Sequence, residues 1–284
     1  MPSPGDPLAH LPADIRHQLA RLTTACQAHF AGRLVGLYLH GSAASGGWQV
    51  SASDLDLLLI VSFWRSADRP VMTALCLDLS AHPGHFELHV LTQRDLRPWG
   101  HPAAYRFHYS ETWRGRISAG APAPGTDVGV GARDREIAAH LTTARAHGLI
   151  LCGRPVTRAI PVVPRLHFID SIFCDLQDSA MTSPGEGYEV LNLCRSWAFL
   201  THGQLLSKEE GGRWALSRLP ADQAATVYQA LVAHRDGGPE DPSRLIAFRC
   251  LLWPTLWASA HPAERAVIRR WWPATVPDLS RSGH

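Results

Sequence analysis

The sequence lacks the features that mark several large protein classes. It has no uninterrupted run of about 18 or more apolar residues, so no segment is expected to cross a bilayer. Its start does not join a basic segment to an apolar one, and we therefore expect no signal peptide, no membrane partner and a cytoplasmic location. The six cysteines are widely separated with no Cys-x-x-Cys pair, which favours buried free thiols over disulfides or a zinc knuckle.

An excess of charge of one sign is also missing. The 27 basic and 25 acidic residues leave a net charge of +2, and the basic residues are scattered, so nucleic acid is not an expected partner. Lysine is almost absent, and Lys208, the only one, is therefore a candidate functional residue. The sequence has neither a GxxxxGK[ST] loop nor a GxGxxG after a strand, so it supports neither a P-loop NTPase nor a Rossmann dehydrogenase.

The length of 284 residues predicts about two domains, of which the first, residues 1–160, carries the strand signals. Pro12 stands at the expected first position of a helix, and one strand is almost continuously apolar, which is typical of a strand covered on both faces. Another strand alternates His85, Glu87 and His89 with apolar residues, the pattern of a half-buried strand. We expect helices at 12–30 and 66–80, and strands at 33–40, 54–62 and 85–91.

The second domain, residues 161–284, shows helical patterns and few strand signals. A Gly- and Pro-rich loop at 119–131 and a hinge at 158–164 precede it. Ser207 and Glu210 have the spacing of a capping box. Further helices are expected at 221–235, 243–260 and 262–272, so the sequence predicts an α+β protein that ends in an all-helical bundle.

The residues with the clearest chemistry lie where the first predicted strand ends and the second begins, and on the third strand. Asp54 and Asp56 project from the same face of an extended chain, and paired carboxylates suit a hard divalent cation such as Mg²⁺. Glu87 on the next strand is the third acid of the cluster. Gly41-Ser42 ends the preceding strand, where glycine allows the backbone to approach a phosphate closely.

This pattern resembles a known family. LYLHGSAASGGWQVSASDLDLLLIV is similar to the signature of the nucleotidyltransferase superfamily, a Gly-Ser turn followed by an Asp-x-Asp strand. Gly46-Gly47, Glu87 and Trp113 narrow the resemblance to the aminoglycoside adenylyltransferases that act on streptomycin and spectinomycin. The similarity covers roughly residues 30–235 and includes TTARAHGLILCGRP (142–155), VLNLCRSW (190–197) and GQLLSKEEGGRWALSRLP (203–220).

The resemblance implies a nucleotidyltransferase-type mixed-sheet domain, a helical bundle domain, and a monomeric enzyme that uses ATP and Mg²⁺. It implies transfer of AMP to a hydroxyl of an aminoglycoside antibiotic, which confers resistance. An ungapped match puts Gly185 where the family has an acidic residue that contacts the drug, with Glu186 and Glu189 adjacent. The implied roles are Mg²⁺ binding for Asp54, Asp56 and Glu87, general base for Glu87, nucleotide binding for Gly41, Ser42, Ser53, Arg195 and Lys208, and substrate binding for Trp113, Glu186 and Glu189.

Other interpretations remain open for the same residues. The alternating His85, Glu87 and His89 would suit a zinc site, since imidazole and carboxylate are zinc ligands. An alternative role for Trp113 is packing in the core. An alternative role for Lys208 is a surface ion pair with one of the two glutamates that follow it. One alternative function for the whole chain is that of a nucleotidyltransferase that modifies another small molecule, or a partner protein as antitoxins do. The other alternative is a binding protein without turnover.

Overall fold

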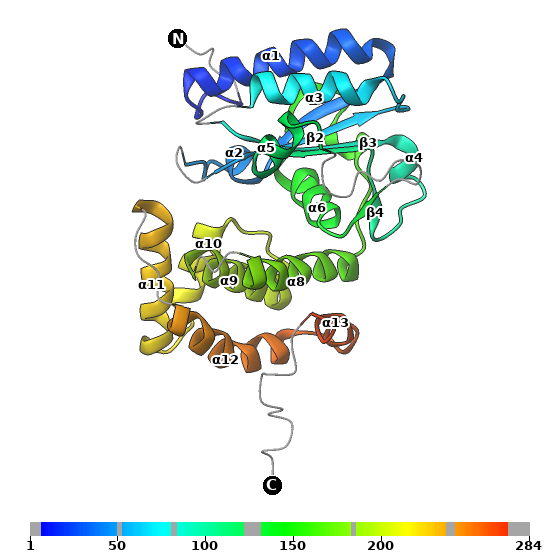
Figure 1. Cartoon of the computed structure of the whole chain (residues 1–284). Helices are drawn as coiled ribbons and strands as arrows, with labels where there is room; N and C mark the ends of the chain where they lie inside the picture. The colour runs from blue at the N-terminus through cyan, green and yellow to red at the C-terminus, as the bar shows by residue number, and fades with distance from the viewer. Residues whose placement is uncertain are drawn as a thin grey trace. The chain divides into compact units, whose positions relative to one another are not determined.

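The computed structural model describes residues 7–49, 53–80, 84–121, 132–182, 186–236 and 242–271. The chain divides into two units, Met1–Val163 and Pro164–His284 (Figure 1). Part of the loop predicted at 119–131 lies outside the described residues. No helix in the described ranges is both long and apolar enough to cross a membrane.

The first unit is built on a five-stranded sheet with the strand order β5-β3-β2-β1-β7. β2 and β3 run parallel, whereas the other neighbouring strands are antiparallel, which confirms the mixed sheet. A parallel pair needs a crossover connection, and α3 (Asp68–Leu79) lies within the segment that supplies it. The strands are β1 (Leu34–His40), β2 (Leu55–Val61), β3 (Phe86–Thr92), β5 (Phe107–Ser110) and β7 (Leu149–Gly153).

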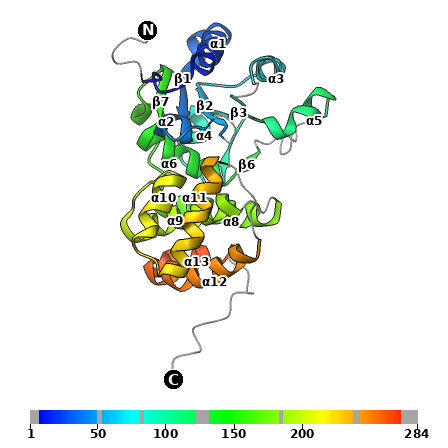
Figure 2. The ribbon, with the colours of Figure 1, turned by 90° about the vertical axis from the view of Figure 1, so that its left-hand side faces the viewer.

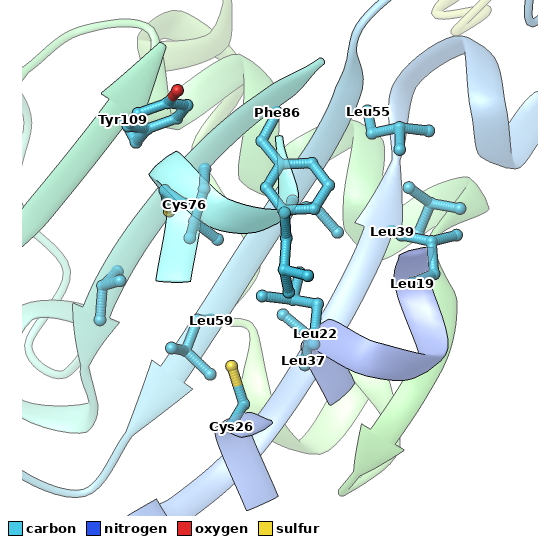
Figure 3. Packing of buried hydrophobic residues seen from close by; sticks show 14 of the residues in the cluster. Leu19, Leu22, Cys26, Leu37, Leu39, Leu55, Leu59, Cys76, Phe86 and Tyr109 are labelled. Atoms are coloured by element: carbon cyan, nitrogen blue, oxygen red, sulfur yellow. The ribbon is translucent and has the colours of Figure 1, made fainter. Parts of the chain in front are cut away.

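One face of this sheet is covered by α1 (Ala13–Phe30) and α3. Leu19, Leu22 and Cys26 recur at helical spacing on α1 and pack with strand residues such as Leu37 and Leu59 in one apolar cluster (Figure 3). The helix begins one residue later than predicted, because Pro12 has extended backbone angles and serves as the N-cap. The alternating side chains of β2 are buried here and on the opposite face, as its continuous apolar run predicts.

The opposite face of the sheet is covered by α6 (Ile137–His147) and α7 (Val156–Ala159). Ile137 and Leu141 of α6 join Tyr38 and Leu58 of the sheet in a second apolar cluster. The polar residues of the candidate site lie on this face, towards one end of the strands. The shorter elements of the unit are η1 (Ala31–Arg33), α2 (Gly41–Ser45), α4 (Gln93–Leu96), β4 (Ala103–Ala104), η2 (Glu111–Trp113), α5 (Arg114–Ser118) and β6 (Arg133–Asp134).

The described part of the second unit is a helical bundle, as the sequence predicts (Figure 2). Its central helix is α9, which contacts α8, α10, α11 and α12. Val190, Leu193, Cys194 and Trp197 are buried as the helical spacing predicts, but so are most other residues of α9, because helices pack around it. The helices are α8 (Arg165–Thr182), α9 (Glu186–His202), α10 (Lys208–Leu216), α11 (Ala221–Asp236), α12 (Pro242–Ser259) and α13 (Pro262–Ile268).

Two local predictions are confirmed by the structure. The Ser207 side chain accepts a bond from the Glu210 backbone, and the Glu210 side chain accepts one from the Ser207 backbone, so the capping box begins α10. All six cysteines lie among the described residues, and none of them forms a disulfide. Four of them are buried as expected, while Cys152 is half-buried and Cys250 is exposed.

Candidate active site

Two of the three predicted acids, Asp56 and Glu87, come together through the register of the sheet. His40 of β1 pairs with Asp56 of β2, Asp56 pairs with Glu87 of β3, and Glu87 pairs with Ser110 of β5. Neighbouring strands lie about 4.8 Å apart and paired residues project from the same face. Asp56 and Glu87 are therefore adjacent on one face, with Asp54 two residues before Asp56 at the entrance of β2.

Gly41 brings the backbone against the Asp56 carboxylate. A Cβ atom placed on Gly41 would lie 1.8 Å from Asp56 Oδ2, and the φ angle of +63° is one that side chains rarely adopt. Only glycine therefore allows α2 to begin directly beside this carboxylate. The position of Gly41 fits its predicted role in a close approach between backbone and phosphate.

The predicted serines form hydrogen bonds in the described parts of the segment between α2 and β2. Ser42 accepts a backbone hydrogen bond of 3.0 Å from Gly47 through its carbonyl oxygen. Ser53 donates its backbone N–H to Gln49, and its hydroxyl oxygen accepts the Gln49 N–H at 3.1 Å. Asp54 follows directly and is exposed, whereas Asp56 is half-buried. Both carboxylates stand beside a tightly turned backbone.

Glu87 lies in a more enclosed place than the alternating pattern predicts. The polar side of β3 is covered, and His89 on that side is only 1% exposed, so the prediction of a half-buried strand is wrong. His108 Nε2 contacts Glu87 Oε1. Burial raises the pKa of Glu87, but the bond from His108 and the nearby His89 and His140 outweigh it and hold the pKa below its ordinary value. Glu87 is thus ionised at neutral pH.

Four histidines surround these acids, and sequence reasoning assigned no role to three of them. The rings of His89 and His108 are stacked with centroids 3.7 Å apart, and His140 of α6 lies 5.0 Å from His89 and 5.2 Å from His40. Burial lowers the pKa of His89 to about 4 and that of His40 well below its usual range, so both imidazoles are neutral at pH 7. The sequence offers no local signal for this cluster, because His140 joins it from α6.

The zinc alternative placed on His85, Glu87 and His89 does not match this arrangement. Among the described residues, the groups able to direct three ligand atoms at one point are His40–Asp56–His140 and Glu87–His89–His108. His85 belongs to neither group because it lies before β3.

Trp113 lies next to the general-base candidate. It ends η2, is half-buried, and packs edge-on against His108 with ring centroids 4.5 Å apart. His108 in turn contacts Glu87, so the tryptophan is two contacts from the Asp56–Glu87 pair. This position suits an aromatic surface beside the reacting group.

The remaining predicted residues belong to the second unit. Glu189 is 2% exposed and forms an ion pair with Arg249 of α12, and burial raises its pKa to about 6. Arg195 is half-buried where α9 meets Gly211 of α10. Lys208 lies with Nζ 4.1 Å from the centre of the Tyr188 ring. The Glu186 side chain lies outside the described residues, and the contacts of these four residues with nucleotide or drug stay predictions.

The donor set at β2 fits the magnesium ion that the resemblance implies. Mg²⁺ binds carboxylate oxygens and keeps several waters, and it commonly uses one or two protein carboxylates with substrate phosphates. Asp54 and Asp56 offer two carboxylates, and the exposed position of Asp54 leaves room for water and phosphate. Gly41 adds a close backbone approach on the same side.

Comparisons with known proteins point to one family. A family model for the C-terminal domain of aminoglycoside adenylyltransferase matches residues 158–245. An aminoglycoside (3'') (9) adenylyltransferase of Shigella flexneri is 30% identical over 241 residues, covering 81% of this chain and 88% of the relative. A spectinomycin 9-adenylyltransferase of Staphylococcus aureus is 27% identical over 214 residues, covering 72% of this chain and 80% of the relative.

A crystal structure supports the same fold. The spectinomycin adenyltransferase AAD(9) from Enterococcus faecialis, with ATP and spectinomycin, superimposes with a TM-score of 0.72 at 18% identity. The match covers 85% of this chain and 98% of that chain, so it includes both the sheet and the helical bundle.

Proposed function

Because the chain belongs to the aminoglycoside adenylyltransferase family, we propose that it transfers AMP from ATP to a hydroxyl of streptomycin, spectinomycin or both, and so confers resistance. The observation that carries this proposal is the register that sets Asp56 directly beside Glu87. A carboxylate that binds the metal ion of a metal-bound nucleotide and a proton acceptor must be neighbours when a hydroxyl attacks an α-phosphorus. Asp56 and Glu87 provide that pair on adjacent strands.

Glu87 accepts the proton of the attacking hydroxyl in this proposal. It is ionised at neutral pH, because the His108 contact and the neighbouring histidines lower its pKa despite burial. His108 fixes the carboxylate through this contact, since its own ring packs against both His89 and Trp113. A proton acceptor held in one orientation requires less rearrangement when the drug binds.

Asp54 and Asp56, with Glu87 as a third acid, are the residues that would hold magnesium. A magnesium ion bound there supplies positive charge that offsets the charge of the triphosphate. Gly41 and Ser42 provide the backbone turn for the phosphates, and Ser53 holds the loop before Asp54. Arg195 and Lys208 are proposed to add positive charge from the helical unit.

Trp113 and acidic residues are proposed to bind the drug. An aminoglycoside is cationic and carries sugar rings, so it is attracted by carboxylates and packs on an aromatic face. Trp113 lies close enough to His108 to place a sugar near Glu87. Glu186 and Glu189 are the acidic candidates on α9, and Glu189 would have to exchange its pairing with Arg249 for a contact with the drug.

The test is a substrate panel with purified protein, ATP and Mg²⁺, in which pyrophosphate release is followed. We expect release only with streptomycin or spectinomycin, with mass spectrometry showing a drug enlarged by one AMP. Kanamycin is a suitable negative control because it is an aminoglycoside whose ring structure differs from those of streptomycin and spectinomycin. Release that no drug stimulates would contradict the substrate class and favour another small molecule or a partner protein as acceptor.

A further inference from the structure

The histidines beside the acids can bind kinds of metal ion that adenylyl transfer does not require. Mg²⁺ prefers oxygen donors, whereas imidazole nitrogen is a preferred ligand of zinc, cobalt, nickel and copper. Two groups of three possible ligands occur among the described residues, one around Asp56 and one around Glu87. Their ring geometry distinguishes them.

The group Glu87–His89–His108 is poorly arranged for a metal ion. The two imidazole rings are stacked at 3.7 Å with an angle of 23° between their planes. The lone pair of an imidazole nitrogen lies in the ring plane, so nearly parallel stacked rings direct their lone pairs past one another. In addition, His108 Nε2 is already in contact with Glu87. This group instead orients the Glu87 carboxylate.

The group His40–Asp56–His140 is arranged differently. Its two rings are inclined at 63° with centroids 5.2 Å apart, an angle that lets in-plane lone pairs converge. Each residue offers one ligand atom, and these atoms all lie within 4.8 Å of one another. Ligand bonds to zinc are about 2.0–2.2 Å long, so its donors lie up to about 4 Å apart and small side-chain rotations close the remaining gap.

Rigid elements hold the three ligands in place. His40 ends β1 and pairs in register with Asp56 of β2, so their positions are tied by the sheet. His140 stands on α6, which packs on this face through Ile137 and Leu141. His40 is buried, Asp56 and His140 are half-buried, and the Nε2 atom of His140 is enclosed. Two imidazoles and one carboxylate are a ligand set found in zinc centres.

We propose that His40, Asp56 and His140 bind a first-row transition metal ion of the zinc and cobalt class, at a site distinct from the Asp54–Asp56 magnesium site but sharing Asp56. A transition metal ion bound there withdraws the Asp56 carboxylate from magnesium. As a consequence, which rests on the proposed function, zinc inhibits Mg²⁺-dependent adenylyl transfer by competition.

The binding test uses the full chain without a histidine tag, stripped of metal with a chelator and titrated with Co²⁺. We expect one equivalent to bind with visible d–d absorption, and Zn²⁺ to displace it. X-ray absorption of the Zn²⁺-loaded wild type is expected to show scattering from two imidazoles and from oxygen. Absence of a stoichiometric Co²⁺ band, or zinc bound without imidazole scattering, would overturn the proposal without any variant.

Variants locate the ion. His140→Leu is expected to weaken Co²⁺ binding at least tenfold, and His140→Asn, which keeps a polar side chain, to give the same loss with an unchanged circular dichroism spectrum. The matched control is His147→Leu, because His147 is on the same helix but exposed, and its affinity is expected to stay unchanged. Equal affinity in wild type and both His140 variants, or loss of the ion in His108→Gln instead, would overturn the assignment.

The competition is tested separately by adding Zn²⁺ to the pyrophosphate assay. Zinc is expected to inhibit the wild type at lower concentration than His140→Leu, and higher Mg²⁺ to relieve the inhibition. Equal inhibition of both proteins would refute the shared carboxylate. If the wild type shows no transfer with any drug, the proposed function fails, while the Co²⁺ titration still decides the metal site.

Discussion

His108 donates a hydrogen bond from Nε2 to the ionised Glu87 carboxylate at Oε1, diagonally across the paired strands β3 and β5. The register pairs His108 with His89 and Glu87 with Ser110, so the histidine reaches the acid from the next pair on the same face of the sheet, two positions along the ladder. Stacking on His89 and the edge-on contact with Trp113 restrict the His108 ring. One strand pair thus sets both the position and the ionisation of the candidate base.

Replacing that acid tests its role directly. Glu87→Gln keeps the size of the side chain but removes the proton acceptor, so we expect turnover to fall by a factor of about 100 to 10,000. ATP affinity, measured by equilibrium binding, is expected to remain close to that of the wild type. Near-normal pyrophosphate release by this variant would show that another group accepts the proton.

His108→Ala separates the orientation of the Glu87 carboxylate from its ability to accept a proton. A hydrogen bond to a charged group contributes about 1.5–3 kcal/mol, so kcat/KM is expected to fall by a factor of about 10 to 100. Because His108 lowers the Glu87 pKa against the effect of burial, its loss is expected to move the acidic limb of the pH profile to higher pH. His108→Gln keeps an N–H donor and is the matched control, expected to restore both the rate and the profile; an unshifted limb in His108→Ala would contradict the assignment.

Gly41→Ala and Gly46→Ala form a matched pair. Both glycines have positive φ angles, +63° and +79°, so each substitution is expected to lower the free energy of unfolding by about 1–2 kcal/mol. Only the Gly41 Cβ meets Asp56, since nothing lies within 4 Å of a Cβ on Gly46. We therefore expect Gly41→Ala alone to raise the KM for Mg²⁺-ATP, as measured by steady-state kinetics at a temperature where both variants are folded. The same KM in the two variants would exclude this role of Gly41.

The double variant Asp54→Asn with Asp56→Asn tests the magnesium ligands. Amide side chains keep the volume but remove both negative charges, and Mg²⁺ depends strongly on carboxylate ligands. Pyrophosphate release is expected to lose its dependence on Mg²⁺ concentration along with the activity. Retained Mg²⁺-dependent release would mean that the ion is held elsewhere.

Asp68→Asn tests a buried ion pair outside the site. Asp68 is 1% exposed, and although burial raises its pKa, bonds from Arg33, the Arg65 backbone and His29 lower it to about 2. The lowered pKa corresponds to a stabilisation of about 2 kcal/mol that is present above the unfolded pKa of about 4 and lost as pH falls towards 2. We expect Asp68→Asn to lower the free energy of unfolding at pH 7, in urea titrations, and to differ less from wild type near pH 2.

Asp78→Asn is the control for that comparison. Its ion pair with Arg21 is exposed on both sides, with side-chain exposures of 53% and 66%, and such pairs contribute at most about 1 kcal/mol. Equal losses in the two variants at pH 7 would contradict the stabilising role of the buried pair.

Hydrophobic periodicity predicted the helices that bury one apolar stripe and the strands that bury a continuous run of apolar residues. The stripe of α1 and the apolar run of β2 each match their predicted ranges closely, because burial selects apolar residues at a fixed spacing. The adjacency of Asp56 and Glu87 was also predictable, since both lie on strands joined by a single crossover helix. These features depend on local pattern and simple topology.

Periodicity reports polarity and not exposure, which explains what was missed. His89 is polar yet covered, because polar rings from β1, β5 and α6 pack against one another on that side. His140 stands far in sequence from β1, β2 and β3 and meets them only after α6 packs on the sheet. Glu189 is a similar case: the sequence shows an acidic residue, but its partner Arg249 comes from another helix of the bundle. Such pairings arise from tertiary packing and leave no local pattern.

The position of Lys208 at the start of α10, directly after the capping residue Ser207, has a practical consequence for chemical labelling. Lys208 is the only lysine of the chain, and it occupies the first helical position after Ser207, over the Tyr188 ring. An amine-selective acylating reagent therefore has one side-chain target besides the N-terminus. The fraction of Lys208 acylated with and without nucleotide, read by peptide mass spectrometry on the unaltered protein, measures directly whether ATP covers this ammonium group.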